Sequence, residues 1–378
     1  MTKEKVIPQI RFSGFTDTWE QRKLGDTVQI TMGQSPDGST YSDVPSDYIL
    51  VQGNADLQNG WVSPRVWTSQ MTKKADAGDL IMSVRAPAGA MGKTAYNAVI
   101  GRGVAAIKGN EFIYQLLEKM DSDGYWKALS CGSTFESLNS DNIKNADVLI
   151  PDVAEQEKIG EYFLAIDRLI TLHQRKYDKL TKVKKAMLEK MFPENGSPYP
   201  EIRFKGFTDA WEQRKLGDIA SDMVAGGDID KDLILAEGQY PVIANALTGD
   251  GIVGYYDKEY RVNAPAVTVT GRGDVGHAKA RLVNFTPVVR LLSVKSEHDV
   301  FFLENVINTL IIVIESTGVP QLTVPQLAKY EVAFPRQLDE EEHIGAFFKQ
   351  LDHLITLHQR KLEKLKNIKK ACLEKMFV

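Results

Sequence analysis

The sequence predicts a mixed α+β fold in which a pair of long antiparallel coiled-coil helices separates two β-rich domains, with a pseudo-two-fold internal repeat. Two observations predict it: two segments occur twice almost unchanged, and one of them carries the apolar spacing of a coiled coil. The chain has 378 residues, of which 43% are hydrophobic and 25% are charged. This is ordinary globular composition, and the length suits two or three domains with separate cores.

The repeated segments are long and specific. Residues 10–26 read IRFSGFTDTWEQRKLGD, and residues 202–218 read IRFKGFTDAWEQRKLGD, so they differ at two positions only. Residues 169–192 and 354–377 both begin with LITLHQRK and end with LEKMF. A solenoid would repeat a shorter unit many times, so the pattern indicates a duplicated half-molecule.

The segments between these repeats differ strongly. Residues 27–150 and 219–335 share almost no running identity. A plain duplication followed by drift is the alternative, but drift would blur the constant and the variable segments alike. The pattern therefore favours a fixed scaffold that carries two exchangeable domains, which we call the first and the second variable domain.

The closing repeats predict two helices, over residues 155–191 and 340–376. Apolar residues recur there in the 4-3-4-3 spacing of a coiled-coil seam, and a helix of this length is about 55 Å long. Prolines precede both helices, Pro193 ends the first, and residues 193–200 read as a stiff polar linker. Because each helix offers one apolar stripe, we expect the two to pair antiparallel. The predicted seam residues are Phe163, Ile166, Ile170, His173, Tyr177, Leu180, Phe348, Leu351, Ile355, His358, Leu362 and Leu365.

Two features of these helices allow alternative interpretations. His173 and His358 could serve a metal site or a pH switch, but a metal needs further ligands at suitable spacing, which favours polar seam residues that fix register. The last turns of both helices are rich in lysine, which indicates a solvated face or a surface that meets DNA phosphate, and we favour the solvated face. These lysines are Lys179, Lys182, Lys184, Lys185, Lys364, Lys366, Lys369 and Lys370.

Each variable domain reads as short strands followed by a helix and a closing strand. In the first domain the strand-like runs YILVQG, GWVSPRVW, DLIMSVRA and GRGVAAIK precede a helix candidate at residues 111–120. The second domain has YPVIANA, GIVGYY, APAVTVTG and PVVRLLSVK before a helix candidate at residues 300–315. The predicted organisation is a first domain at 1–150, a helix at 151–193, a linker and second domain at 194–335, and a helix at 336–378.

Catalytic motifs are missing from the sequence. Residues 271–276 form a literal GxGxxG, but HAKARLVNF follows them and reads as the second strand of a hairpin, so these glycines indicate a turn. We find no P-loop, HExxH, GxSxG or persuasive carboxylate pair. An Asn-Pro-Pro-aromatic segment is missing too, since the nearest string, residues 195–199, lies in the linker. The sequence predicts a binding protein without catalytic residues, metal or cofactor of its own.

Charge, cysteine content and apolar runs limit the ligands and the cellular compartment that we expect for this protein. The net charge of −4 excludes a general polyanion binder, so any nucleic-acid site must be a local basic patch. Cys131 and Cys372 have no disulfide or CxxC spacing, which fits a reducing compartment. The first residues lack the apolar region of a signal peptide, and no apolar run is long enough to cross a bilayer. We expect a cytoplasmic protein without membrane contact.

The best contact candidates are basic and amide side chains in or near the turns of the variable domains. Arginine can address guanine, asparagine and glutamine can address adenine, and lysine mostly meets phosphate. In the first domain they are Gln52, Asn54, Arg65, Lys73, Lys74, Arg85, Lys93, Arg102 and Asn142. In the second domain they are Asn245, Lys258, Arg261, Arg272, His277, Lys279, Arg281, Arg290 and Gln321.

These residues carry a family resemblance. IRFxGFTDxWEQRKLGD, the acidic entries at residues 155–157 and 340–342, and LITLHQRK…LEKMF closely resemble the specificity subunit of bacterial Type I restriction–modification enzymes. The resemblance covers the full length and occurs in both halves. It implies that the variable domains are target-recognition domains, each reading half of a bipartite, asymmetric double-stranded DNA site, and that the helices set the gap between the half-sites.

The resemblance also implies partners. The helices would dock modification (methyltransferase) subunits, which carry S-adenosylmethionine, while a restriction subunit carries the ATP-driven activity. Two other readings stay open on the residues alone: a nucleotide-binding enzyme that uses the turn at 271–276, and a coiled-coil adaptor that binds no DNA.

Overall fold

The computed structural model describes residues 7–130, 137–194, 196–313 and 320–378, so Cys131 and Asn195 lie outside the described residues. The chain forms two compact units. Unit 1 comprises Met1–Arg175 and Arg360–Val378, and unit 2 comprises Lys176–Gln359. Each unit therefore contains one variable domain together with parts of both long helices. The domain boundaries predicted at residues 150, 193 and 335 stay a prediction.

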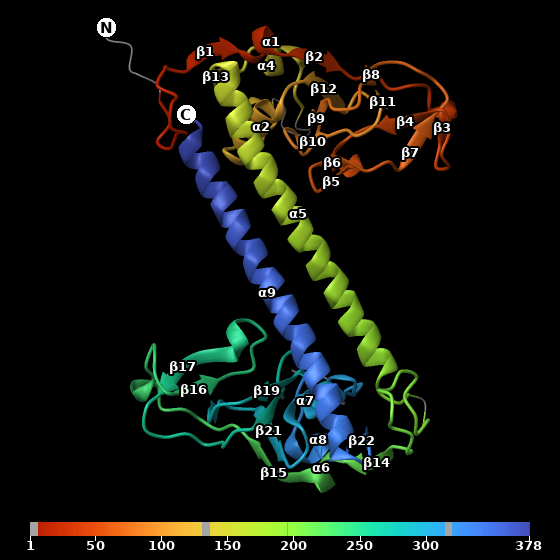
Figure 1. Ribbon diagram of the computed structural model, residues 1–378, viewed down its shortest axis with the longest axis vertical. Coiled ribbons are helices and arrows are strands. Elements are labelled where there is room, and N and C mark those ends of the chain that lie inside the picture. The colour runs from red at the N-terminus through yellow and green to blue at the C-terminus, as the bar shows by residue number, and fades with distance from the viewer. Residues whose placement is uncertain (1–6, 131–136, 195, 314–319) are drawn as a thin grey trace. The chain divides into compact units, whose positions relative to one another are not determined.

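The two long helices agree with the sequence prediction. Helix α5 spans Val153–Lys190 and helix α9 spans Leu338–Met376, so each begins two residues before the predicted start. The seam residues predicted from the apolar spacing are buried or half-buried in the structure, all twelve of them. Figure 1 shows both helices as single long ribbons.

Contacts within each unit show that the helices run antiparallel. In unit 1, Tyr162 lies 3.4 Å from Cys372, and further along α5 Asp167 lies 2.8 Å from Lys369. Residue numbers therefore rise along α5 and fall along α9. Unit 2 has the same relation, since Lys184 pairs with Asp352 at 2.6 Å and Phe192 packs on Phe348. The antiparallel pairing is thus confirmed in both units.

The first variable domain contains two sheets. The first has the order β2-β12-β9-β10-β6-β5 and the second β3-β7-β4-β11-β8. The strands of the first sheet are β2 (Gln29–Met32), β12 (Val104–Lys108), β9 (Leu80–Ser83), β10 (Met91–Lys93), β6 (Trp61–Val62) and β5 (Leu57–Gln58). The strands of the second sheet are β3 (Tyr41–Ser42), β7 (Val66–Thr68), β4 (Tyr48–Val51), β11 (Ala98–Ile100) and β8 (Lys74–Ala75).

The first variable domain also contains short helices and a separate strand pair. The helices are α1 (Leu24–Thr27), α2 (Glu111–Ser122), α3 (Tyr125–Leu129) and α4 (Ser140–Lys144). Strand β1 (Glu20–Lys23), which lies in the constant segment, pairs antiparallel with β13 (Asp147–Ile150) just before α5 begins. The constant segment therefore holds the end of the variable domain at the start of the long helix.

The second variable domain repeats this plan with fewer strands. Its sheets have the orders β15-β21-β18-β19 and β17-β16-β20, and β14 pairs with β22. The strands are β14 (Glu212–Lys215), β15 (Ala220–Ala225), β16 (Tyr240–Ile243), β17 (Ile252–Tyr256), β18 (Ala266–Thr270), β19 (Ala278–Arg281), β20 (Thr286–Pro287), β21 (Leu291–Ser296) and β22 (Glu331–Phe334). The helices are α6 (Leu216–Ile219), α7 (Val300–Asn308) and α8 (Val324–Leu327).

Three sequence expectations need correction. PVVRLLSVK is not one strand, since the turn closed by the Leu291 amide and the Val288 carbonyl separates β20 from β21. The helix expected over residues 300–315 ends at Asn308, because the following Ile311-Ile312-Val313 run is β-branched and such residues form helices poorly. GWVSPRVW is not one strand, since Ser63-Pro64-Arg65 separates β6 from β7. In contrast, the expected hairpin after residues 271–276 is confirmed, because β18 and β19 pair antiparallel.

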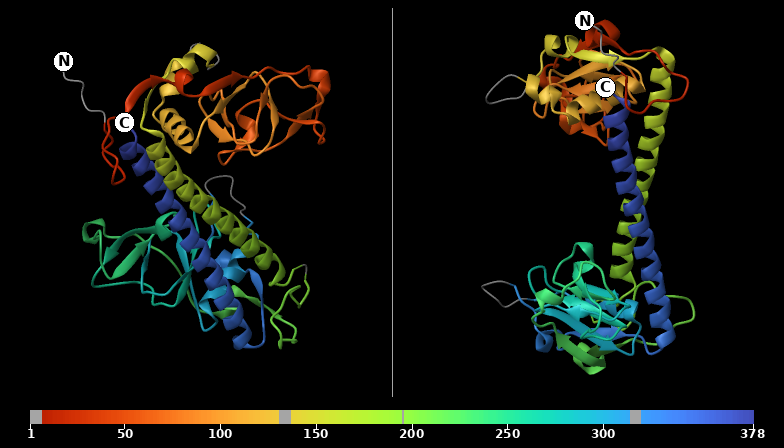
Figure 2. Two further views of the ribbon diagram at one scale, coloured as in Figure 1. Left: turned by 45° about the horizontal axis from the view of Figure 1, so that its top comes forward. Right: turned by 90° about the vertical axis from the view of Figure 1, so that its left-hand side faces the viewer.

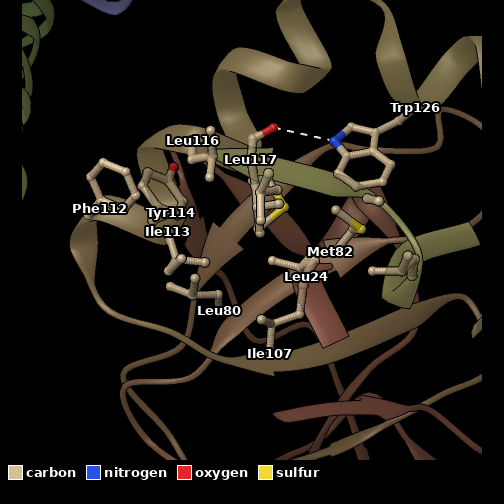
Figure 3. Close-up of a cluster of buried hydrophobic side chains, with 14 of the residues drawn as sticks. Leu24, Leu80, Met82, Ile107, Phe112, Ile113, Tyr114, Leu116, Leu117 and Trp126 are labelled. Atoms are coloured by element: carbon tan, nitrogen blue, oxygen red, sulfur yellow. Dashed lines mark hydrogen bonds between the residues drawn. The ribbon is translucent and has the colours of Figure 1, made fainter. Parts of the chain in front are cut away.

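Each unit has its own apolar core, in which a variable domain packs on the long helices. In unit 1 the buried face of α2 meets β9 and β12, and the Trp126 indole donates a 3.4 Å hydrogen bond to the Leu117 carbonyl (Figure 3). Phe163 of α5 and Phe377, just beyond α9, belong to the same core. The domain and the helix ends therefore share one contiguous core.

The constant segments are anchored to the long helices by buried ion pairs. Arg11 makes a two-bond contact with Glu155, at 2.6 and 2.7 Å, and Glu155 is fully buried. The Ile10 amide donates to the Lys375 carbonyl at 2.9 Å, so the constant segment also caps the end of α9. Figure 2 shows this segment beside the C-terminal end of α9. In unit 2, Arg203 and Glu340 form the matching pair.

Unit 2 should become less stable as the pH rises from about 4.5 to about 7. Burial of Glu304 on α7 raises the pKa of its carboxyl from 4.5 to about 7, and the nearby Asp352 charge adds to the effect. Because the folded-state pKa is the higher one, the folded state holds a proton that the unfolded state has lost in this range. Ionising this group should therefore cost unit 2 up to about 3 kcal/mol.

The measurement is the unfolding free energy of the full chain between pH 4.5 and 7.5, for the wild type and for Glu304→Gln. Glutamine has no proton to lose, so the unfolding free energy of the variant should change less with pH than that of the wild type. An identical pH dependence in both proteins would contradict the assignment.

Among the described residues, no helix is both long enough and apolar enough to cross a membrane.

Candidate nucleic-acid interface

The two variable domains carry a loop of the same construction between their central strands. In the first domain it joins β9 to β10, and the Ser83 amide donates to the Ala90 carbonyl while the Gly89 amide donates to the Ser83 carbonyl, both at 2.8 Å. In the second domain it joins β18 to β19. Here the Thr270 amide donates to the His277 carbonyl at 3.0 Å, and the Gly276 amide donates to the Thr270 carbonyl at 2.8 Å. The two loops therefore have the same length and the same closing bonds.

A second contact fixes the position of one arginine in each loop. A later segment of the chain lies against the loop in both domains. The Leu138 amide donates to the Val84 carbonyl, and the Leu322 amide donates to the Gly271 carbonyl, each at 2.9 Å. Next to these bonds, Arg85 forms an antiparallel bridge with Ser137, and Arg272 forms one with Gln321. Arg85 and Arg272 thus occupy the same place in the two halves, and both are exposed.

Further predicted residues lie beside Arg85 in the first domain. The Val84 amide donates to the carbonyl of Gly103 at 2.9 Å, which brings the turn that carries Arg102 against the loop. A Cβ on Gly103 would lie 2.0 Å from the Gln52 carbonyl oxygen, so Gln52 packs against the same turn. We call Gln52, Arg85 and Arg102 the first arginine edge.

The second domain gathers four predicted residues in the corresponding place. The Asn245 carboxamide accepts from the Gly271 amide at 2.8 Å and donates to the Val289 carbonyl at 3.0 Å, so it ties two loops together. The Arg290 guanidinium donates to the Gln321 side-chain oxygen. We call Asn245, Arg272, Arg290 and Gln321 the second arginine edge.

Lys93 was expected to be a contact residue, and the structure corrects this. Its side chain is buried, its ammonium lies 2.6 Å from Glu111, and it sits 4.1 Å from the centre of the Tyr114 ring. A buried lysine that is paired with a carboxylate inside the domain is a poor candidate for a contact at the surface. Its role is to tie β10 to α2.

The other candidates belong to neither edge, and most of them are engaged in contacts within the domains. Several contact another group of the protein: Arg65 with Asp56, Lys74 with Asp76, His277 with Asp274, Lys279 with Asp250, Arg261 with the Asp228 carbonyl, Arg281 with Thr268, and Asn142 with the backbone of Asn139. Burial lowers the pKa of Arg281 below its ordinary value. Asn54 is half-buried, while Lys73 and Lys258 are exposed.

Sequence reasoning listed Arg85 and Arg272 separately and missed that they correspond. A signal was available: a hydroxyl residue stands two positions before each arginine, and a glycine stands four positions after it. Gly89 and Gly276 both have positive φ, at 105° and 91°, which explains why the spacing to a glycine is retained. The identities between them differ entirely, so the running identity of the domains hides the pattern.

Two observations concern the metal site and the phosphate contact that the sequence allowed on the long helices. No group of three or more His, Cys, Asp or Glu side chains able to hold a metal occurs among the described residues. The lysines predicted as a solvated face or a phosphate contact include Lys184 and Lys369, and these two pair with Asp352 and Asp167 across the helices.

An open recess of about 800 Å³ lies in unit 1 where the constant segment meets the start of α5. Its lining includes five carboxylates, from Asp17, Glu20, Asp26, Asp79 and Asp152, against two basic side chains. This balance disfavours a polyanion there. The arginine edges are the better candidates for a nucleic-acid contact.

Comparisons with known proteins agree on one family. The family described as "Type I restriction modification DNA specificity domain" matches residues 16–182 and 208–367, once in each half. The chain is 22% identical to the type I restriction enzyme MjaIX specificity subunit of Methanocaldococcus jannaschii, over 95% of this chain and 92% of that protein. It is 29% identical to the MjaX specificity subunit of the same organism, over 49% of this chain and 45% of that protein.

Other similarities are partial or concern the fold alone. A type I specificity subunit of Mycoplasma pneumoniae, S.MpnORF507P, is 26% identical over 55% of this chain and 56% of that protein. With MjaX and S.MpnORF507P, the chain thus spans about half the length of the relative. The crystal structure of the Type I restriction–modification S subunit from M. genitalium superposes with a TM-score of 0.75 at 13% identity, covering 98% of this chain and 99% of that one.

The fold resembles that S subunit over nearly its whole length, and the family match occurs twice, in step with the internal repeat. Since that match covers most of the residues, the chain belongs to the Type I restriction modification DNA specificity family.

Proposed function

We propose that this chain is the sequence-specific DNA-binding specificity subunit of a Type I restriction–modification complex, and that each variable domain reads one half of a bipartite, asymmetric site. The observation that carries the proposal is the placement of Arg85 and Arg272 on the same loop in the two halves. An exposed arginine on a fixed loop can make two hydrogen bonds to guanine, which is the commonest specific contact in the major groove.

The net charge of the chain indicates that it needs partner subunits to bind DNA. With a net charge of −4 the chain has little general attraction for DNA, so a complex that closes around the duplex would supply the remaining phosphate contacts. We propose modification and restriction subunits as those partners. Methyl transfer from S-adenosylmethionine and ATP-driven work would belong to them, and this chain would contribute no catalytic group.

The exposed faces of the long helices suit the docking of modification subunits. Leu169 and Leu354 hold the same position in the two repeats, and they are 45% and 40% exposed. Leu172, one turn further on α5, is 46% exposed. Apolar side chains that recur in this way on a helix favour a partner helix. We therefore propose that one modification subunit docks on each repeat. We also propose that the complex works in the cytoplasm.

Arg85→Ala and Arg272→Ala should each weaken the complex on its cognate site by about 1–3 kcal/mol. The two losses should concern different halves of the site, because base readout is local to each domain. The measurement is the methylated motif in a host that carries this chain with its modification subunits, followed by competition binding with single-base variants of that motif.

Lys258→Ala is the control, since Lys258 is exposed, belongs to neither arginine edge and, as a lysine, mostly meets phosphate, so the motif should stay unchanged. The proposal fails if both arginine variants keep the wild-type motif and affinity. It also fails if each variant alters both halves at once.

A further inference from the structure

Arg290 has an unusual backbone conformation. It is the third residue of a tight turn closed by the Leu291 amide, which donates to the Val288 carbonyl at 2.9 Å, and its φ is 70°. This left-handed conformation suits glycine or asparagine and is strained for a long side chain. The corresponding turn of the first domain, closed by Val104 and Gly101, has Gly103 at the third position.

The surrounding backbone clamps this turn. A Cβ on Gly271 would lie 2.1 Å from the Arg290 carbonyl oxygen, and a Cβ on Gly226 would lie 2.1 Å from the Val288 carbonyl oxygen. The Arg290 amide also donates to the Gly226 carbonyl at 3.2 Å. Two glycines without side chains therefore admit the turn on either side. The second domain keeps an arginine at a place where the fold itself would accept glycine.

The side chain of Arg290 is also held in place. It is half-buried, and one guanidinium nitrogen donates to the side-chain oxygen of Gln321. Because arginine carries no acceptor, the oxygen of the glutamine must face it, so the glutamine NH₂ group faces elsewhere. The backbone of Gln321 is in turn bridged to Arg272, the exposed arginine of the same edge.

We propose that Arg290 and Gln321 form a preassembled reader of one guanine in the half-site of the second domain, with Arg290 as the reading residue and Gln321 as the positioning residue. This rests on the proposed function. The guanidinium of Arg290 carries only N–H donors, which match the two acceptors, N7 and O6, on the major-groove edge of guanine. A phosphate contact tolerates many arginine rotamers and would give no reason to keep the strain, whereas reading one base edge requires a fixed fork.

Arg290→Gly separates a reading role from a structural one. Glycine relieves the left-handed strain, so the full chain should unfold at the wild-type temperature or above it. With its modification subunits, the same variant should lose about tenfold or more of its discrimination for one guanine of the second half-site. The other half-site should stay unchanged. A residue with a merely structural role would not combine retained stability with a relaxed motif.

Two further variants complete the test. Asn59→Gly is the matched control, because Asn59 is also left-handed, at a φ of 52°, and lies in a turn of the first domain away from the first arginine edge. It should keep the full motif. Gln321→Glu retains an acceptor for Arg290 and should keep the guanine preference, whereas Gln321→Ala should weaken it.

The outcomes distinguish this inference from the proposed function. A wild-type complex that methylates without any sequence preference overturns both. A wild-type complex with a defined motif and an Arg290→Gly variant with the same motif and discrimination overturn the guanine reader alone.

Discussion

Replacing Arg11 by methionine should lower the unfolding free energy of unit 1 by about 3–5 kcal/mol. The side chain of Arg11 is 11% exposed, and its guanidinium holds both carboxylate oxygens of Glu155, whose side chain is fully buried. Methionine fills a similar volume but leaves this carboxylate without its charged partner. The cost comes from the stranded charge rather than from the lost attraction, since a buried ion pair by itself contributes little.

Hydrogen exchange of peptides from unit 1 and unit 2, followed by mass spectrometry, measures the two stabilities separately. Arg203→Met should have the same effect on unit 2, because Arg203 holds Glu340 at 2.6 and 2.8 Å. Arg22→Met is the control, since Arg22 and Glu20 form an exposed pair in the same constant segment and should contribute almost nothing. A double variant, Arg11→Met with Glu155→Leu, should recover most of the loss.

If Arg11→Met cost less than about 1 kcal/mol, water would have to reach Glu155 in the variant, and the pair would not anchor the constant segment.

The long helices could be predicted closely because several local signals coincide there. The apolar spacing, the prolines at residues 151 and 335 and the length of the pattern all favour a helix, and the observed bounds differ by at most two residues. Where the signals conflict, the prediction was less accurate. The apolar run after Asn308 continued the pattern of a helix, but its β-branched residues favour an extended backbone.

The candidate site was only partly accessible from the sequence because its contacts are not local. Asn245 reaches the backbone at Gly271 and Val289, and Arg290 reaches Gln321, 31 residues away. Residue type identified Asn245, Arg290 and Gln321 as candidates, but nothing in the linear order indicated that they meet. The same limit explains why Lys93 was wrongly expected at the surface, because its partner Glu111 lies on α2, a later element of the chain.

Phe377→Ala should destabilise unit 1 by about 3–5 kcal/mol, which is the usual cost of removing a buried phenylalanine. The ring is 3% exposed and packs on three aromatic rings from three different segments. Its centre lies 5.1 Å from that of Phe112 in α2, 6.1 Å from Trp19 in the constant segment and 5.8 Å from Phe163 in α5. One residue beyond the end of α9 therefore joins the first variable domain, the constant segment and both helices.

The internal repeat supplies the matched variant and decides between two explanations. Phe192 holds the same place in unit 2, with its ring centre 6.1 Å from Trp211, 5.6 Å from Phe302 and 5.9 Å from Phe348. If these rings join each variable domain to the helix pair, Phe377→Ala should raise hydrogen exchange throughout unit 1 and leave unit 2 protected, and Phe192→Ala should do the reverse. Val378→Ala, at an exposed neighbour of Phe377, should change neither. Faster exchange confined to the last turn of α9 in Phe377→Ala would instead mean that the ring only secures the helix end, and that the variable domain keeps its place without it.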